Sequence, residues 1–385
     1  MWTNKQHIMS RLARDHRVYH VDFGSPSLPR FAWRRFRSER SGLPLSASVE
    51  ADGGVHVVTI YRPSLAAMLP AHSQARIFLE FDLRLRMLRR FLVDQGLTDS
   101  ILWIYHPGFG KAALDLPHRL SLYDCVDEYS EFPNYRRSPG WLIQREAELC
   151  RAADLVFTTS QTLLEKKRPL NPDHTHLAHN VGDAAHFGRA LDPELRVPED
   201  IAGLRRPVVG FIGAVSDYKL NVDWIEHLAA SRPGISIVLI GPVGLSDASQ
   251  NHRRLQRFEN VHLLGHRPYE QLPAYVKGFD VAVIPYNLNE YTAHCFPIKF
   301  FELLATGKPV VISALPALEG YFDDVRVARD AEEFSRHCEE AVADPVRGGA
   351  RRLALAGEND WDSRIRQIME RVEQRLTEMR EASAR

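Results

Sequence analysis

Residues 296–311 of the chain read FPIKFFELLATGKPVV, and they carry the strongest signal in the sequence. Pro297 suits the first turn of a helix, because the N–H group that proline lacks has no intrahelical partner there. Gly307 is typical of a residue that ends a helix, and a pair of valines follows it. The stretch therefore predicts a helix over residues 297–306 and a buried strand over residues 309–312.

The rest of the C-terminal half continues this pattern of short apolar runs that leave room for one helix between them. Apolar strands alternating with helices predict a parallel sheet covered on both faces. We expect strands at residues 208–212, 235–240, 261–264, 281–284 and 309–312, and helices at residues 221–230, 247–258, 269–276 and 297–306.

The N-terminal half shows the same alternation of apolar strands and helices, but less regularly. The sequence opens directly on a helix, whereas a doubly wound domain normally opens on a strand. Either the start is trimmed or the domain is unusual, and its first strand is missing. We expect helices at residues 5–13 and 74–93, and strands at residues 18–23, 55–60, 101–105, 121–125 and 155–158.

The length of 385 residues favours two domains over one. Residues 183–206 hold prolines and few periodic apolar positions, so they predict a linker. We assign residues 1–190 to an N-terminal domain, residues 206–360 to a C-terminal domain and residues 361–385 to a final helix. That helix carries an apolar stripe at spacings of three and four: Ile365, Ile368, Met369, Val372, Leu376 and Met379.

The amino-acid composition excludes several classes of protein. A formal net charge of zero, with 25% charged and 44% hydrophobic residues, is ordinary for a globular protein and argues against nucleic-acid binding. No apolar run approaches the roughly 20 residues of a membrane span, so membrane contact would be peripheral. The four cysteines form no CxxC pair or Cys/His cluster, which favours a reducing cytoplasm without a disulfide frame or structural zinc.

The 296–311 stretch also predicts a nucleotide site. The first turn of the helix offers N–H groups and a positive dipole to a phosphate, and Lys299 adds a full charge. Glu302 lies three residues on, on the same helix face, where a carboxylate suits ribose hydroxyls. The alternative is a solvated ion pair on an amphipathic helix. Pro297, Lys299 and Glu302 are therefore candidate donor-binding residues.

A second candidate donor element follows the strand at residues 208–212. Gly213 permits close backbone approach to a diphosphate, with Ala214 beside it. Lys219 can neutralise that diphosphate, or it is a lysine on a surface loop.

These segments resemble those of GT-B retaining glycosyltransferases of the group 1, family 4-like kind. The 296–311 stretch is similar to their proline, lysine, glutamate, alanine, glycine, proline-valine-valine signature. The resemblance extends over nearly the whole chain, and residues 123–129 are similar to a segment of bacterial polysaccharide transferases of the teichuronic-acid type. The other matching segments are residues 154–160, 180–183, 210–214 and 265–269.

The resemblance implies an α/β protein of the GT-B fold. Two Rossmann-like doubly wound domains face a cleft, and the C-terminal helix crosses back to the N-domain. The second domain binds a nucleotide-diphosphate sugar, whose base is received at the turn holding Arg267. The first binds a saccharide or lipid-linked acceptor, and transfer in cell-surface polysaccharide or glycolipid synthesis proceeds with retention. No cofactor and no metal is implied.

The candidate catalytic residues are Asp127, His106 and His294. Asp127 follows an apolar strand together with Asp124 and Glu128, so it contacts acceptor or sugar, caps a loop or binds a metal. His106 closes another strand, where such enzymes often have a histidine near the substrates, although a lone histidine is more often structural. His294 departs from the family, since many members have a glutamate eight positions before the one matched by Glu302; a neutral or protonated imidazole can still donate to a sugar hydroxyl or phosphate.

The loop at residues 30–40 mixes aromatic side chains with five arginines. It predicts a basic face that rests on an anionic membrane surface, or else solvated arginines with buried aromatics. Two rival functions stay open: a GT-B nucleotide-sugar epimerase, and a catalytically weak nucleotide-sugar-binding partner of a polysaccharide assembly. The arginines of this face are Arg30, Arg34, Arg35, Arg37 and Arg40, joined by Arg84, Arg86, Arg89 and Arg90.

Overall fold

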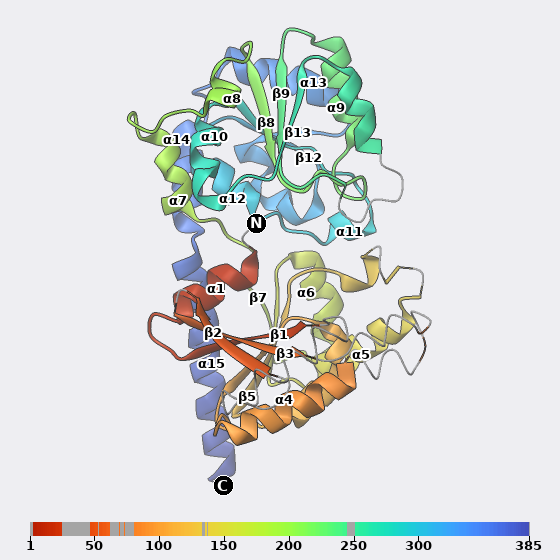
Figure 1. The fold of residues 1–385 in the computed structure, drawn as a ribbon, viewed down its shortest axis with the longest axis vertical. Coiled ribbons are helices and arrows are strands. Elements are labelled where there is room, and N and C mark those ends of the chain that lie inside the picture. The colour runs from red at the N-terminus through yellow and green to blue at the C-terminus, as the bar shows by residue number, and fades with distance from the viewer. Residues whose placement is uncertain are drawn as a thin grey trace. The chain divides into compact units, whose positions relative to one another are not determined.

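In a computed structural model the chain forms two compact units (Figure 1). The segment predicted as a linker, residues 183–206, is part of unit 1. Unit 1 comprises Met1–Thr3, Thr159–Thr162 and His179–Arg364, and unit 2 comprises Asn4–Thr158, Leu163–Ala178 and Ile365–Arg385. The structure describes residues 3–24, 47–52, 54–61, 69, 73, 81–132, 135–136, 138–244 and 251–384. The predicted basic loop at residues 30–40 lies outside the described residues.

Unit 1 is built on a six-stranded parallel sheet in the order β10-β9-β8-β11-β12-β13. The five strands predicted from apolar runs are confirmed, and β13 at the edge is an addition. The strands are β8 (Val208–Ile212), β9 (Ser236–Ile240), β10 (Val261–Gly265), β11 (Val281–Ile284), β12 (Val310–Ser313) and β13 (Arg326–Ala328).

Helices cover both sides of this sheet (Figure 1). On one side α9 (Val222–Ser231) packs against α13 (Ala331–Ala343), with Trp224 and Phe334 in ring contact at 5.5 Å. The helix expected at residues 247–258 is, in its described part, a 3₁₀ segment, η7 (Asn251–Arg257). The other helices of the unit are α7 (Ala184–Gly188), α8 (Glu199–Ala202), α10 (Leu272–Lys277), α11 (Glu290–Ala293), α12 (Lys299–Leu304) and α14 (Gly349–Glu358).

The chain order in this sheet creates a switch point. The chain runs outward from β8 to β9 and β10, then returns to place β11 on the other side of β8. The connections that follow β8 and β11 therefore leave the same sheet edge in opposite directions. Ligands of doubly wound sheets bind in the crevice at such a point.

The described strands of unit 2 form two sheets. One is the parallel sheet β4-β5-β6-β7, and in the other β1 pairs with β3 in parallel and β2 with β3 antiparallel. The sequence did not indicate β2 or β7. The strands are β1 (Val18–Gly24), β2 (Ala47–Asp52), β3 (Val55–Tyr61), β4 (Ile101–Ile104), β5 (Leu120–Cys125), β6 (Leu155–Thr158) and β7 (Thr175–Leu177).

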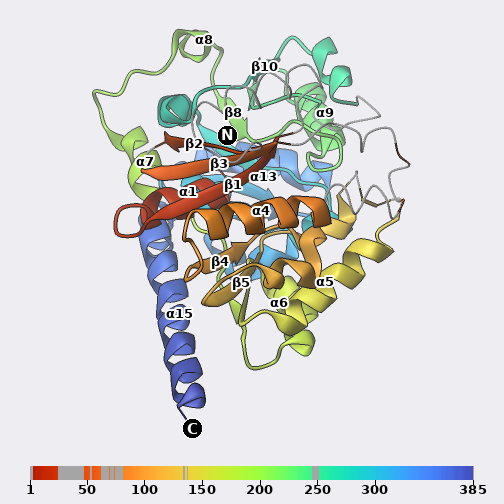
Figure 2. The same ribbon diagram turned by 60° about the horizontal axis from the view of Figure 1, so that its bottom comes forward.

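Alternate side chains of β5 enter different cores of unit 2. Tyr123 and Cys125 join a core with α4 (Leu83–Asp94) and α5 (Gly140–Ala152), and Figure 2 shows α4 beside strands of both sheets. Leu120 and Leu122 face α15 (Trp361–Ser383), whose Ile368 and Val372 are buried, so the predicted apolar stripe of the last helix is confirmed. The other helices are α1 (Asn4–Leu12) and α6 (Gln161–Lys167), the latter beginning in unit 1.

None of the described helices combines the length and apolar character needed to cross a membrane.

Candidate functional site

The 293–302 segment connects α11 to α12 beyond the carboxyl end of β11. Upstream, Asn289 begins α11 with a capping box: its side chain accepts from Thr292 N, and Thr292 Oγ1 accepts from Asn289 N. Downstream, buried Pro297 precedes α12, and Gly307 follows it with φ of +68°. The Gly307 signal is therefore confirmed, whereas Pro297, expected in the first turn, lies two residues before α12 begins at Lys299.

Lys299 and Glu302 form a buried ion pair in α12. Lys299 Nζ lies 2.5 Å from Glu302 Oε2, and the Tyr269 hydroxyl donates to Glu302 Oε1 at 3.1 Å. Glu302 is 0% exposed, so the solvated pair considered from the sequence is wrong. Burial raises the pKa of Glu302, and the Lys299 ammonium and the Tyr269 hydroxyl oppose this shift. The ammonium also lies 5.2 Å from the centroid of Phe187.

Gly182 packs directly against the backbone of α12. A Cβ atom added at this glycine would lie 2.6 Å from Glu302 N and 2.8 Å from the carbonyl carbon of Phe301. Only glycine allows this approach, so residue 182 sets where the candidate donor helix lies.

We expect Gly182→Ala to lower the free energy of unfolding by about 1–3 kcal/mol, because the contacted backbone must shift to admit the methyl group. Urea denaturation measures the change. Gly203→Ala is the matched control in the same unit, since a Cβ atom there meets nothing within 4 Å. Equal midpoints for the two variants would contradict the assigned contact.

The glycine loop after β8 is in close contact with the loop after β9. Gly213 N donates to Ile240 O at 2.9 Å, and a Cβ atom on Gly241 would lie 1.9 Å from Gly213 O. Ala214 follows, half-buried. Lys219 is half-buried, with its ammonium 4.9 Å from the ring centroid of Tyr286, two residues after the end of β11. The two connections at the switch point therefore meet at Lys219.

Arg267 forms hydrogen bonds with side chains of neighbouring helices. Its guanidinium bonds to Asp200 at 3.0 Å and to the Tyr275 hydroxyl at 2.7 Å. These bonds tie the turn after β10 to α8. The structure thus places this predicted donor residue in a network with α8 and α10.

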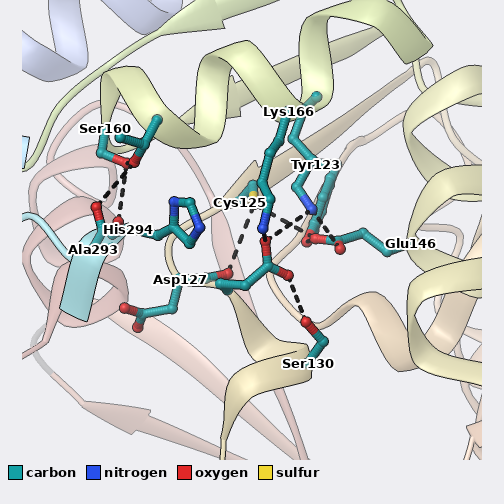
Figure 3. Close-up of polar contacts among 12 residues, drawn as sticks. Tyr123, Cys125, Asp127, Ser130, Glu146, Ser160, Lys166, Ala293 and His294 are labelled. Carbon is teal, nitrogen blue, oxygen red and sulfur yellow. Dashed lines mark hydrogen bonds and ion pairs between the residues drawn. The ribbon is translucent and has the colours of Figure 1, made fainter. Parts of the chain in front are cut away.

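His294 follows α11, and its backbone is held by the segment Thr159–Thr162, which belongs to the same unit. Ser160 Oγ donates to His294 O at 2.9 Å, and Thr162 Oγ1 donates to Ala293 O at 3.2 Å. Figure 3 shows Ser160 above these two carbonyl groups. No local pattern indicated these two contacts, because their partners lie 134 and 131 residues apart along the chain.

In unit 2, His106 is enclosed by aromatic rings and engaged at both nitrogens. Nδ1 accepts from Gly108 N at 3.0 Å, so Nε2 carries the proton and donates to the Tyr135 hydroxyl at 3.1 Å. Burial, with the Arg84 and Lys5 charges, lowers the pKa of His106 to about 4. The imidazole is neutral near pH 7. The surrounding rings are those of Phe81, Phe109, Tyr129 and Tyr135.

The shifted pKa of His106 predicts a loss of stability in mild acid. Its folded pKa of about 4 lies below the unfolded value of 6.5, so between these pH values the unfolded chain binds more protons. The contribution is fully present above pH 6.5 and falls by about 3 kcal/mol as pH drops to 4. We expect His106→Asn, which can still accept from Gly108 N, to flatten this part of the curve in urea titrations at several pH values. Unchanged pH dependence would show that His106 titrates normally.

The three acids have different environments: Asp124 lies within β5, and Asp127 and Glu128 follow that strand. Asp124 is 0% exposed and accepts from Trp103 Nε1 at 3.2 Å. Glu128 is 3% exposed and accepts from Lys166 at 3.0 Å and Ser130 at 2.8 Å. Asp127 lies half-buried between them. Of the three, Asp127 is the one that is partly exposed, whereas Asp124 and Glu128 are buried.

Behind these acids lies a buried ionic network that the sequence did not reveal (Figure 3). Lys167 Nζ donates to Glu146 Oε2 at 2.6 Å and lies 3.7 Å from Glu128 Oε2. Tyr123 donates to Glu146 Oε1 at 2.6 Å. Burial alone would raise the pKa of Glu128, but the Lys167 and Lys166 charges lower it, so the carboxylate is ionised. Within the described ranges, no group of three or more His, Cys, Asp or Glu side chains is arranged to hold a metal ion.

Known proteins resemble the chain in sequence and in fold. Residues 206–344 match the family model described as glycosyl transferases group 1. TuaH of Bacillus subtilis (strain 168), named as a teichuronic acid biosynthesis glycosyltransferase, is 25% identical over 374 residues, which cover 87% of this chain and 92% of TuaH.

Solved structures match at a TM-score that establishes the fold. A trehalose-6-phosphate protein from E. coli, bound with UDP-2-fluoro glucose, matches at a TM-score of 0.69 and 11% identity, covering 96% of this chain and 95% of that one. The sucrose-phosphate synthase of Thermosynechococcus elongatus matches at 0.67 and 17% identity, covering 96% and 92%. The chain therefore has the GT-B fold of glycosyltransferases, and its residues 206–344 match the group 1 glycosyl transferase family.

Proposed function

We propose that this enzyme moves a sugar from a nucleotide-diphosphate sugar to a saccharide or lipid-linked acceptor, with retention, in cell-surface polysaccharide or glycolipid synthesis. The observation that carries the proposal is the switch point between β8 and β11. The Gly213 loop follows one strand and the 293–302 segment lies beyond the other, so two predicted donor elements share one sheet edge. The relatives' names support this chemistry, since one is bound with UDP-2-fluoro glucose and another is named for teichuronic acid biosynthesis.

In the proposed donor site, Gly213 and Ala214 lie against the diphosphate and Lys219 neutralises it. Pro297 and Lys299 belong to the helix start that the sequence assigns to the phosphates. Glu302 contacts the ribose, which can reach this carboxylate only by replacing the Tyr269 hydroxyl, because Glu302 is fully enclosed. Arg267 acts through the turn that receives the base.

For the transfer step we propose roles of orientation and charge stabilisation. His106 can donate Nε2–H to the acceptor or sugar only by exchanging the Tyr135 hydroxyl for it, and Asp127 contacts the acceptor or sugar. His294 donates to the donor sugar or its phosphate. Because retention allows the leaving diphosphate to take the acceptor proton, no protein base, metal or cofactor enters the proposal. The anomeric configuration of the product, read by NMR, tests retention.

The first test is thermal stabilisation by UDP-, GDP-, ADP- and dTDP-sugars. A ligand that binds only the folded chain raises its melting temperature in proportion to RT ln(1 + [L]/Kd). We expect one nucleotide family to shift the melting temperature of the wild-type chain. If none does, the donor site is misplaced and transfer from a nucleotide sugar is not the function.

We further propose that the enzyme works in the cytoplasm, at the inner face of an anionic membrane. The four cysteines, all within the described residues, are buried and form no disulfide. On α4, Arg86, Arg89 and Arg90 are exposed, in line with the basic face predicted from the sequence. Co-sedimentation with anionic vesicles, lost on replacing these three arginines by glutamate and absent with neutral vesicles, tests the membrane contact.

A further inference from the structure

The 293–302 segment contains backbone carbonyl groups that its own helices leave unbonded. Helices α11 and α12 are four and six residues long, so the peptides between them have no intrahelical acceptors or donors to pair with. The carbonyl of Phe296 lies in this gap, and its residue is 4% exposed. A buried carbonyl needs a donor from elsewhere in the chain.

Asn180 supplies that donor. Its Nδ2 donates to Phe296 O at 2.8 Å, in a bond between two buried groups 116 residues apart. The neighbouring His179 ring stacks on the Phe296 ring, with centroids 5.3 Å apart and an interplanar angle of 19°. The peptide just before Pro297 is therefore fixed by an amide and by a ring.

Asn180 is itself held by a buried arginine. Arg364 Nη1 donates to Asn180 Oδ1 at 3.1 Å, and Asn180 and Arg364 are 6% and 3% exposed. The Arg364 bond occupies the amide oxygen and so requires that the NH₂ group face Phe296 O. A charged donor makes a stronger bond than a neutral one, so the orientation of the amide is well determined.

Both residues lie next to a passage, that is, a point where the chain leaves one unit and enters the other. Asn180 is one residue past the passage at Ala178 and His179, and Arg364 is the last residue before the passage at Ile365. Ser160 and Thr162, from a third passage, bond to the carbonyls of His294 and Ala293. Residues beside three separate passages thus form the hydrogen bonds that hold the 293–302 segment.

We propose that Asn180, oriented by Arg364, is a positioning residue that sets the geometry of the donor-binding 293–302 segment. This inference rests on the proposed function for the role of that segment, although the contacts stand without it. Asn180 touches no substrate in this scheme; it acts through the Phe296 peptide on Pro297 and the helix that follows.

The test uses Asn180→Asp in the full chain. This substitution keeps an oxygen for Arg364 and replaces the donor to Phe296 O by an oxygen of the same size. We expect the dissociation constant of the best-binding nucleoside diphosphate among UDP, GDP, ADP and dTDP to rise about tenfold, since a buried acceptor loses its partner. We also expect faster amide hydrogen exchange in peptides covering residues 293–302.

Asn260→Asp is the matched control. Asn260 Nδ2 donates to the backbone carbonyls of Ala229, Arg232 and Ile235 in the same unit, at the start of β10 and away from the 293–302 segment. Its substitution should lower the melting temperature, yet leave nucleotide affinity and exchange at residues 293–302 unchanged. A purely structural role for Asn180 would give the two variants the same profile.

Each outcome decides between the alternatives. Wild-type affinity together with wild-type exchange at residues 293–302 in Asn180→Asp overturns the inference. If that variant does not fold, Arg364→Gln is measured instead, with the same expectations and the same overturning result. If the wild-type chain binds none of the four nucleotides, the proposed function fails, and the exchange measurement alone still decides whether Asn180 positions the segment.

Discussion

Replacing Lys167 by methionine should lower the free energy of unfolding by about 3–5 kcal/mol, the usual cost of leaving a buried charge without its partner. Lys167 and Glu146 are 6% and 4% exposed and bonded at 2.6 Å. Burial alone would lower the pKa of Lys167, but the carboxylates beside it raise the pKa above its ordinary value, so the lysine is an ammonium ion. Without it, the carboxylates of Glu146 and Glu128 lose their shared buried cation. Urea denaturation near neutral pH measures the loss.

Lys166→Met is a closely matched control. The two lysines are neighbours in α6 and both lie near Glu128, but the Lys166 side chain is 48% exposed and that of Lys167 is 8% exposed. A pair of this exposure contributes about 0–1 kcal/mol. Similar losses for the two variants would mean that water reaches the network and that the assigned burial is wrong.

The buried ionic network around Lys167 also affects the candidate catalytic residue Asp127. Glu128 is anchored by the lysines and by Ser130, and the Cys125 thiol donates to Asp127 O at 3.8 Å. The network therefore fixes the backbone on both sides of the candidate acceptor contact. Any residual transferase activity of Lys167→Met should show a larger change in acceptor KM than in donor KM, whereas the Asn180 variants should show the reverse.

Strands β8, β9, β11 and β12 were predictable because each is buried throughout and so reads as a largely apolar run. Strands β7 and β13 were not, since each has three residues and an edge position, and neither Thr175–Leu177 nor Arg326–Ala328 forms such a run. The 3₁₀ segment η7 was expected as an α-helix, because a pattern of apolar spacing does not distinguish the two.

The candidate site was predictable only where its parts are close in sequence. Lys299 and Glu302 lie three residues apart, so helical geometry alone placed them together. Their burial depends on Tyr269, 33 residues before Glu302, and on Gly182. Glu146 and Lys167 occupy helix positions that look solvated in the sequence, and only the packing of α5 and α6 around β5 makes them an internal pair. Tertiary contacts of this kind leave no local signal.

Replacing Glu302 by leucine should lower the free energy of unfolding by about 3–5 kcal/mol, because the Lys299 ammonium then stays buried without a carboxylate. The double variant Lys299→Met/Glu302→Leu should recover most of this loss, since an apolar pair of similar volume often matches a buried ion pair in stability. Urea denaturation of the two variants measures both effects. An undiminished loss in the double variant would show that the pair matters for more than charge compensation.

The double variant also separates the structural role of the pair from its role in binding. It should fold near wild-type stability and yet bind the preferred nucleoside diphosphate at least about tenfold more weakly, since one lost hydrogen bond to a charged group contributes about 1.5–3 kcal/mol. Calorimetry at equal folded fraction gives the affinity. Wild-type affinity in a folded double variant would mean that Lys299 and Glu302 only support α12. In that case the donor contacts would have to come from the Gly213 loop and Lys219 on the other side of the switch point.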